Sequence, residues 1–167
     1  MKQLKETIQK IKLIVLDVDG VLTDGSLYYH KDGEAIKRFH VRDGQGIKLA
    51  QAYDIEFAII SGRECEIVKN RFTELGIKHI YQHCHDKGKR IKLLAAEVGV
   101  ELEEIAYIGD DILDVPPMEI VGLSVCPKDA HPSCLNRAKL VTELPGGEGC
   151  VRELIDLILK EQGKITI

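Results

Sequence analysis

Acidic side chains gather in the sequence where two short apolar runs end. Asp17 and Asp19 follow the first run, and Asp110, Asp111 and Asp114 follow a later one. Carboxylates brought together at a partly buried site repel one another strongly. A hard divalent cation relieves that repulsion, and ligands that are all oxygen atoms favour Mg²⁺ over zinc or copper. The pattern therefore predicts a Mg²⁺ site.

Two further polar residues suit the binding of phosphate. Ser61 and Lys87 each follow another apolar run; the hydroxyl can donate a hydrogen bond and the ammonium group supplies a positive charge. Alternate residues of an extended chain point the same way, so Asp17 and Asp19 share a side. One carboxylate can then attack phosphorus while the other reaches the leaving-group oxygen. Each signal alone is common in loops, but the ordered set indicates phosphoryl transfer.

The elements that must position these residues alternate between strand and helix. Short β-branched runs bounded by turn residues predict buried strands at 12–16, 56–60, 78–82, 105–108, 122–126 and, more weakly, 139–142. Helical spacing of apolar residues predicts helices at 45–53, 64–75, 88–98 and 149–161. The alternation predicts an α/β fold, a doubly wound, Rossmann-like parallel sheet. Ligands bind such a sheet at the carboxyl ends of its strands, where the polar residues above fall.

The segment 26–40 interrupts this alternation. Asp32-Gly33 between two extended runs predicts a β-hairpin inserted after the first strand. Because an isolated hairpin is marginally stable in water, its apolar residues are expected to pack against another subunit. The alternative is a hairpin folded onto its own domain. The residues concerned are Tyr28, Tyr29, Ile36 and Phe39.

Composition narrows the class of protein. The 167 residues are 44% hydrophobic and 30% charged, as expected for one globular domain over 1–167. The net charge of −4 argues against a nucleic-acid partner. No apolar run is long enough to span a membrane, and the charged N-terminus does not resemble a signal peptide, so a cytoplasmic location is expected.

The cysteines and histidines offer no second site. The five cysteines are scattered and odd in number, which predicts free thiols. His79, His83, Cys84 and His85 look like a metal cluster, but they fall across a strand and its exit loop, where helical spacing does not apply. A place for His83 or His85 at the mouth of the site near Lys87 is the less demanding interpretation.

The ordered set resembles the four motifs of the haloacid dehalogenase-like phosphatases over nearly the whole chain. The resemblance implies that Asp17 is the nucleophile, forming an aspartyl-phosphate, and that Asp19 is the general acid and then the base. It also implies that Ser61 and Lys87 bind the transferring phosphoryl group. The motifs are Asp17-x-Asp19-Gly-Val-x-Thr23, Ser61, Lys87 and Gly109-Asp110-Asp111-x-x-Asp114.

The same resemblance implies how the metal is held. Mg²⁺ would be bound by Asp17, the backbone carbonyl of Asp19, and Asp110. Asp111 and Asp114 would support the metal shell or the phosphate-binding lysine.

The spacing of the motifs leaves no room for a cap domain. Members of this superfamily carry caps between the first and second motifs or between the second and third. Here the first gap holds the predicted hairpin and one helix, and the second holds one helix and one strand. The chain is thus similar to capless members that form a tetramer whose hairpins build a central barrel, which implies a homotetramer.

Within the superfamily the chain is similar to phosphatases of a sugar acid, 3-deoxy-D-manno-octulosonate 8-phosphate, which implies a role in lipopolysaccharide precursor synthesis. Arg63 favours this substrate, because the group acting on 2-keto-3-deoxynononate 9-phosphate tends to carry Glu there. Glu148 departs from the Arg usual in the octulosonate group. The similar stretches include LDVDGVLTDG (16–25), FHVRDGQGI (39–47), IISGR (59–63) and YIGDD (107–111).

Alternative functions stay open. The protein could act on another sugar-acid phosphate, such as the nononate. It could be a phosphoacceptor receiver domain, although receivers place their acidic pair on the first strand. It could also be a non-catalytic oligomerisation module, against which the intact motif set argues.

Candidate substrate-binding residues lie close to the motifs. Arg63 and Arg71 are about two helical turns apart and could share a face that holds the substrate carboxylate. The alternative is that both are solvated surface residues. Thr23 and Gly62 complete this set. The loop 146–149 is either a hinge or a loop whose amides reach toward an anion.

Overall fold

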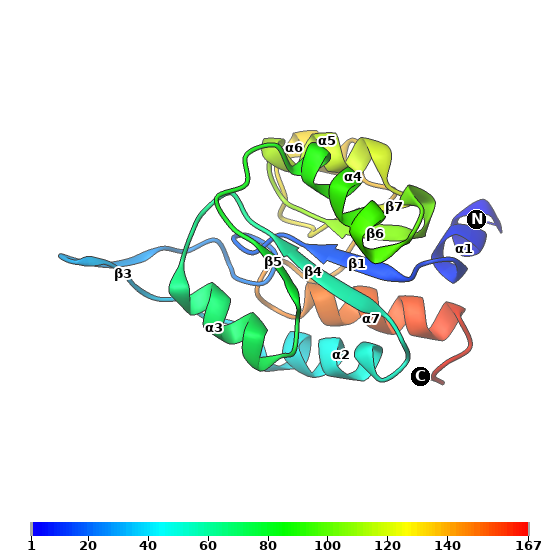
Figure 1. Ribbon diagram of the computed structural model, residues 1–167, viewed down its shortest axis with the longest axis horizontal. Coiled ribbons are helices and arrows are strands. Elements are labelled where there is room, and N and C mark those ends of the chain that lie inside the picture. Colours follow the sequence, from blue (N-terminus) through cyan, green and yellow to red (C-terminus); the bar gives the residue numbers. More distant parts are fainter. Residues whose placement is uncertain (1, 167) are drawn as a thin grey trace.

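The computed structural model describes residues 2–166, except the side chains of 34 and 35. A sheet of six parallel strands forms its centre (Figure 1). The doubly wound α/β fold predicted from the sequence is confirmed. Across the sheet the strands are β5 (His79–Tyr81), β4 (Glu56–Ile60), β1 (Leu13–Leu16), β6 (Ile105–Ile108), β7 (Leu123–Cys126) and β8 (Leu140–Val141).

Helices cover both faces of the sheet (Figure 1). One face carries α1 (Lys2–Gln9), α2 (Val41–Gln51), α3 (Glu66–Glu74) and α7 (Cys150–Glu161). The other carries α4 (Lys87–Val98), α5 (Val115–Ile120) and α6 (Pro132–Leu135), with the short 3₁₀ helices η1 (Leu102–Glu104) and η2 (Ile112–Asp114) nearby. The sequence patterns predicted α2, α3, α4 and α7. None of the helices in residues 2–166 is both long and apolar enough to cross a membrane.

The central strand β1 is buried on both faces. Ile14 and Leu16 pack with α2 and α7, while Leu13 and Val15 pack with α4. This alternation follows from the period of two residues in a strand, and burial on both faces explains why the run contains no polar residue. Because β1 lies in the middle of the sheet, the residues that follow it reach the centre of the sheet's carboxyl edge.

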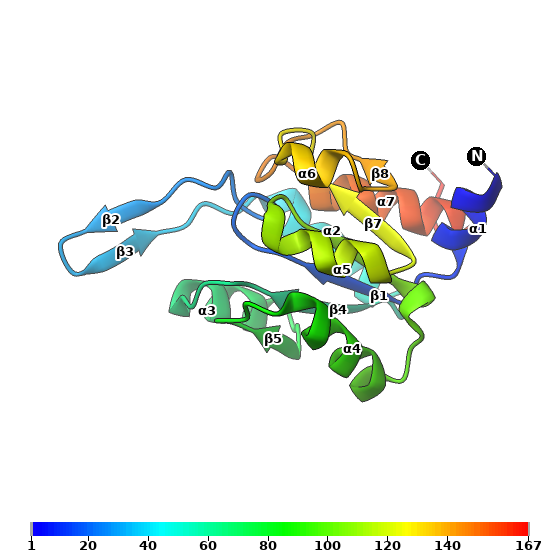
Figure 2. The ribbon, with the colours of Figure 1, turned by 90° about the horizontal axis from the view of Figure 1, so that it is seen from above.

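The predicted hairpin is present and extends away from the sheet (Figure 2). Its strands are β2 (Tyr28–His30) and β3 (Gly33–Ile36), paired antiparallel. Tyr28, Tyr29 and Ile36 are exposed, as a surface that contacts another subunit would be. The prediction for Phe39 was wrong, because its ring packs edge-on against Phe72 of the same chain with centroids 5.6 Å apart.

A carboxylate of α2 caps the N-terminus of α7. The N-cap residue of α7, Gly149, has no side chain to do so, and Asp43 Oδ1 accepts a hydrogen bond of 2.8 Å from the backbone N–H of Arg152. The other oxygen, Oδ2, is buried without a hydrogen-bond partner among the described residues. Burial therefore raises the pKa of Asp43 to about 6, although the Arg152 N–H acts in the opposite direction.

This raised pKa makes stability depend on pH. Between about pH 4 and pH 6 the folded protein keeps a proton on Asp43 that the unfolded chain has released, so stability falls as pH rises. Asp43→Asn, which does not titrate, should gain roughly 3 kcal/mol in unfolding free energy relative to wild type between pH 4 and pH 7. Urea unfolding followed by circular dichroism measures this. The exposed Asp32→Asn is the control, and a pH-independent difference for Asp43→Asn would contradict the assignment.

Candidate active site

A pocket of about 260 Å³ opens at the carboxyl edge of the sheet. The residues that line it come from loops after β1, β4 and β6 and from the start of α4. The structure therefore brings together nearly all the residues singled out from the sequence. They are Asp17, Asp19, Ser61, Gly62, Arg63, Lys87, Asp110, Asp111 and Asp114.

Lys87 forms the centre of the buried ion pairs. Its Nζ atom lies 3.0 Å from Asp17 Oδ1 and 2.6 Å from Asp114 Oδ1, and its side chain is 2% exposed. Lys87 is the first residue of α4, whose N-cap Asp86 accepts a hydrogen bond from Lys89 N. Burial alone would lower the pKa of Lys87, but the two carboxylates outweigh it and raise that pKa. Lys87 therefore stays charged in the pocket.

The carboxylates outnumber the ammonium group beside them. Burial, and next the charge of Asp114, raises the pKa of Asp17 to about 7. Burial, followed by the charges of Asp17 and Asp114, raises the pKa of Asp110 to about 8. Both shifts show that one ammonium group does not balance this much negative charge. A bound cation would balance this negative charge.

Asp114 is held rigidly by donors of the protein. Its Oδ2 accepts hydrogen bonds from the backbone N–H groups of Asp110 and Asp111, at 2.9 and 3.1 Å. Its Oδ1 accepts from Lys87 and from the hydroxyl of Tyr107, a fully buried residue of β6. Tyr107 was missed from the sequence, because within the apolar run of β6 an aromatic residue is indistinguishable from core.

The turn after β1 brings two acidic loops into contact. Leu22 N and Thr23 N both donate to Val18 O, which closes the turn. Gly20 has φ +83°, and a Cβ there would lie 2.0 Å from Asp110 Oδ2. Only glycine adopts this conformation without strain and also leaves room for the Asp110 carboxylate.

Ser61 and Asp19 face the same space from two different loops. Ser61 N donates to Tyr81 O at 2.9 Å, which extends the sheet hydrogen bonding by one residue and fixes the hydroxyl at the strand end. Asp19 pairs with Lys37, and Arg63 Nε lies 3.7 Å from Asp19 Oδ2. Lys37, from the base of the hairpin, is a second residue that sequence analysis missed.

Two of the candidate substrate-binding residues lie outside the pocket. Thr23 is buried within the turn, where its hydroxyl oxygen accepts from Gly25 N at 3.2 Å. Arg71 pairs with Glu74 and lies against α2, its Nη2 2.5 Å from where a Cβ on Gly44 would be. Arg71 and Arg63 share a helical spacing, but Arg63 precedes α3, so the expected common face is not formed.

The glycine loop before α7 packs on the turn after β1. Gly147 N donates to Val21 O, and Gly146 N donates to Asp129 Oδ1. A Cβ on Gly146 would lie 2.0 Å from Gly20 O, so glycine is needed for this close approach. The loop is thus neither a free hinge nor, in its first two amides, available to an anion. Glu148, which stands where Arg is usual in the octulosonate group, pairs with Arg38 at 2.8 Å.

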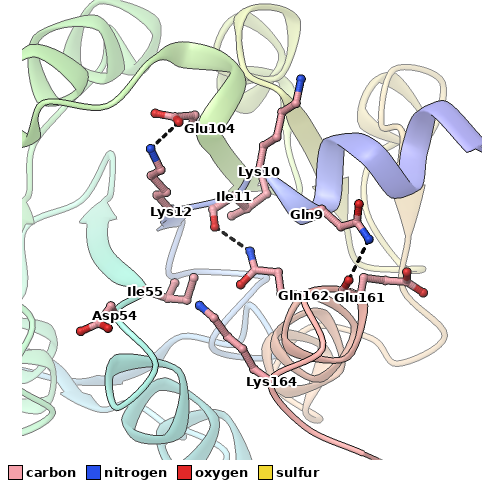
Figure 3. A pocket seen from close by; sticks show the side chains of 10 residues that line it. All are labelled: Gln9, Lys10, Ile11, Lys12, Asp54, Ile55, Glu104, Glu161, Gln162 and Lys164. Carbon is pink, nitrogen blue, oxygen red and sulfur yellow. Dashed lines mark hydrogen bonds and ion pairs between the residues drawn. The ribbon is translucent and has the colours of Figure 1, made fainter.

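A second hollow, of about 520 Å³, lies where α1 runs into β1 and α7 ends (Figure 3). Three interactions join its polar groups: Lys12 pairs with Glu104, Gln9 donates to Glu161 O, and Gln162 donates to Ile11 O. The side-chain oxygen of Gln162 is buried without a hydrogen-bond partner among the described residues. Among the residues that the structure describes, this hollow holds no group of carboxylates with metal-binding geometry.

The histidine cluster forms no metal site in the described part of the chain. His83 and His85 are in edge-on contact, and His79 lies beside the Tyr81 hydroxyl. A group with metal-binding geometry is found elsewhere, at Asp17, Asp110 and Asp114, whose ligand atoms lie within 4.8 Å of one another. Because both oxygens of Asp114 already accept hydrogen bonds, Asp17 and Asp110 remain for a cation.

Comparison with known proteins identifies the class. The model of the haloacid dehalogenase-like hydrolase family matches residues 76–154, which include Lys87 and the acidic loop after β6. The parallel sheet and the acidic pocket at its carboxyl edge agree with that class.

More similar proteins identify the family within the class. The 3-deoxy-D-manno-octulosonate 8-phosphate phosphatase KdsC of Escherichia coli K12 is 48% identical over 157 residues, covering 94% of this chain and 84% of the relative. A Yersinia pestis structure of that name superposes with a TM-score of 0.94 at 45% identity, covering 97% and 88% of the two chains. A Moraxella catarrhalis structure of the same name, in complex with magnesium, phosphate and KDO, superposes with a TM-score of 0.94 at 37% identity. The match covers 98% of this chain and 94% of that one. The chain belongs to this phosphatase family.

The hydroxyl of Tyr107 provides a test of how Asp114 is held. Tyr107→Phe removes a buried hydrogen bond to a carboxylate and should lower the unfolding free energy by about 1.5–3 kcal/mol. The matched control is Tyr81→Phe. The Tyr81 hydroxyl donates to the exposed Glu97, so its removal should lower the unfolding free energy by less than about 1 kcal/mol. Urea unfolding of both variants measures the difference, and equal losses would contradict the role given to Tyr107.

Proposed function

We propose that the protein hydrolyses 3-deoxy-D-manno-octulosonate 8-phosphate to the free sugar acid and phosphate, in a Mg²⁺-dependent reaction. The observation that carries the proposal is the pocket that joins Asp17, Asp19, Ser61 and Lys87 at one edge of the sheet. The relatives named for this reaction add the substrate. The sugar acid would serve the synthesis of lipopolysaccharide precursors.

The donor set fits Mg²⁺. Asp17 and Asp110 supply carboxylate oxygens, and the Asp19 backbone carbonyl is the third proposed ligand. When bound, the ion neutralises charge on the phosphoryl oxygens and on these carboxylates. Asp114 and Asp111 would support the site through the hydrogen bonds that hold the loop after β6.

The first half of the reaction uses both residues of the first motif. A carboxylate oxygen of Asp17 attacks phosphorus, and the bond from phosphorus to the sugar oxygen breaks. Asp19 gives its proton to that oxygen, so that the sugar acid leaves as an alcohol. Lys87 and Ser61 bind the oxygens of the phosphoryl group while it transfers, and the pairing of Lys87 with Asp17 Oδ1 orients the nucleophile.

The second half releases phosphate. Asp19, now ionised, takes a proton from a water molecule that attacks the phosphorus of the aspartyl-phosphate. The bond from phosphorus to Asp17 breaks, and the free carboxylate is restored. Ser61 and Lys87 keep their contacts throughout.

Arg63 is the residue proposed to bind the substrate carboxylate. It lines the pocket beside Gly62, and its side chain is 38% exposed, so the guanidinium can reach a ligand. A bidentate pair with a carboxylate is the strong form of such a contact. A nononate phosphate is the alternative substrate.

The exposed hairpin supports a proposal of a homotetramer. Tyr28 and Ile36 pair across β2 and β3 and are 46% and 59% exposed. An exposed apolar ribbon of this kind is typical of a protein interface.

The proposed reaction is tested by phosphate release. Wild-type protein with Mg²⁺ should hydrolyse the octulosonate ester faster than the nononate ester, and both faster than a sugar phosphate without a carboxylate. Asp17→Asn should lower turnover by roughly 10⁴-fold or more, because an amide is a poor nucleophile. Its circular dichroism spectrum should remain that of wild type.

The controls separate metal, nucleophile and substrate. EDTA should stop turnover and Mg²⁺ should restore it, whereas zinc should not. Turnover by Asp17→Asn within tenfold of wild type would remove Asp17 as the nucleophile. Faster hydrolysis of the nononate ester would mean that the nononate phosphate is the substrate, while the proposed reaction steps would stand.

The tetramer is tested by sedimentation. Ile36→Glu would place a charge in an apolar interface, which costs several kcal/mol, and should shift the protein to smaller species. Leu93→Glu, on α4 far from the hairpin and 48% exposed, is the matched control and should remain tetrameric. A monomeric wild type at micromolar concentration would refute the assembly.

A further inference from the structure

Lys37 contacts Asp19 from outside the pocket. It directly follows β3 at the base of the hairpin, and its ammonium group donates a hydrogen bond to Asp19 Oδ1. Its side chain is 1% exposed, and Lys37 does not line the pocket, whereas Asp19 does. Lys37 therefore touches a pocket residue without facing the space that a substrate would occupy.

The inward direction of Lys37 follows from the extended chain around it. Its neighbours Ile36 and Arg38 are exposed, as alternate residues of a strand are when the central one is buried. A buried ammonium group is costly unless an opposite charge compensates for it. Asp19 supplies such a charge, so the base of the hairpin and Asp19 are bound to each other.

Asp19 has a cation on each of its oxygens. Lys37 contacts Oδ1, and Arg63 Nε lies 3.7 Å from Oδ2. Arg63 also donates to the hydroxyl of Tyr29 in β2, at 3.2 Å. Both cations thus connect Asp19 to the hairpin, one through β2 and the other through the residue after β3. Together they restrict the rotation of the carboxylate.

We propose that Lys37 is a positioning residue that orients the carboxyl group of Asp19 toward the leaving-group oxygen, and thereby makes proton transfer depend on the placement of the hairpin. This inference rests on the acid–base role proposed for Asp19. The ammonium group contacts no reacting atom. Lys37 holds Asp19 Oδ1 by a hydrogen bond, whereas Arg63 Nε lies 3.7 Å from Oδ2, beyond hydrogen-bond distance, so Oδ2 is the oxygen that can reach the substrate.

Two esters whose leaving groups differ in their need for a proton distinguish a positioning role of Lys37 from a general structural role. An alkyl phosphate such as the sugar-acid ester needs a proton on its leaving oxygen. A nitrophenyl phosphate does not, because nitrophenolate leaves as the anion. Lys37→Met should therefore lower kcat/KM on the alkyl ester by roughly 10- to 100-fold and change kcat/KM on the nitrophenyl ester by less than about threefold. The ratio kcat/KM is compared because it covers only the steps up to departure of the leaving group, whereas kcat also contains the hydrolysis of the aspartyl-phosphate, which both esters share.

Matched variants test the route of the effect. Arg38→Met removes the neighbouring exposed cation and should leave the ratio of the two kcat/KM values as in wild type. Lys37→Gln can still donate a hydrogen bond to Asp19, so its activity on the alkyl ester should lie between those of Lys37→Met and wild type. It replaces Lys37→Met in the comparison if that variant does not fold. In an Asp19→Asn background, Lys37→Met should have no further effect on the alkyl ester, because the residue through which it acts is already changed.

The outcomes distinguish this inference from the proposed function. Equal losses on both esters, additive losses with Asp19→Asn, or no loss at all would overturn the role of Lys37. A wild-type protein that hydrolyses a simple alkyl phosphate and the nitrophenyl ester, but not the octulosonate ester, would refute the proposed substrate. The comparison for Lys37 would then be made on the simple alkyl ester.

Discussion

The charge around Lys87 constrains the rest of the site. A buried ammonium group binds Asp17 and Asp114 together, yet the carboxylates exceed it in number. Removing each charge from water costs several kcal/mol, so such a cluster persists only where partners surround it. The amides of the loop after β6, the Tyr107 hydroxyl and the start of α4 are those partners. The fold thus concentrates negative charge where the proposed cation and phosphate ester would bind together.

The loops that build the pocket are packed on one another as well as on the sheet. The turn after β1 is in contact with Asp110 on one side and with the glycine loop before α7 on the other. Glycine at 20 and 146 is required by two close approaches of backbone and side chain. The C-terminal segment therefore packs against the turn that carries the first motif. Because Glu148 pairs with Arg38, this segment is also tied to the base of the hairpin.

The sequence predicted the sheet, four helices and the hairpin, because buried strands and amphipathic helices have apolar periods that are visible in one dimension. It did not predict α5 or α6, which are too short to show a period, or α1, where only Ile8 is buried. The motif residues were found because they follow strands. Tyr107, Lys37 and the cap at Asp43 were missed, since each acts on a residue distant in sequence. Arg71 was misplaced because helical spacing does not show which way a helix faces.

The position of β1 has a consequence for how the chain is made. It is the first strand to be synthesised, yet its neighbours in the sheet start at Glu56 and Ile105. At about 5–20 residues per second, its apolar run Leu13–Leu16 leaves the ribosome roughly 5–20 s before the second neighbour does. Long-range parallel pairing is slow and exposes unpaired strand edges meanwhile. The strand that precedes Asp17, the proposed nucleophile, therefore waits longest for its partners and depends on protection during synthesis.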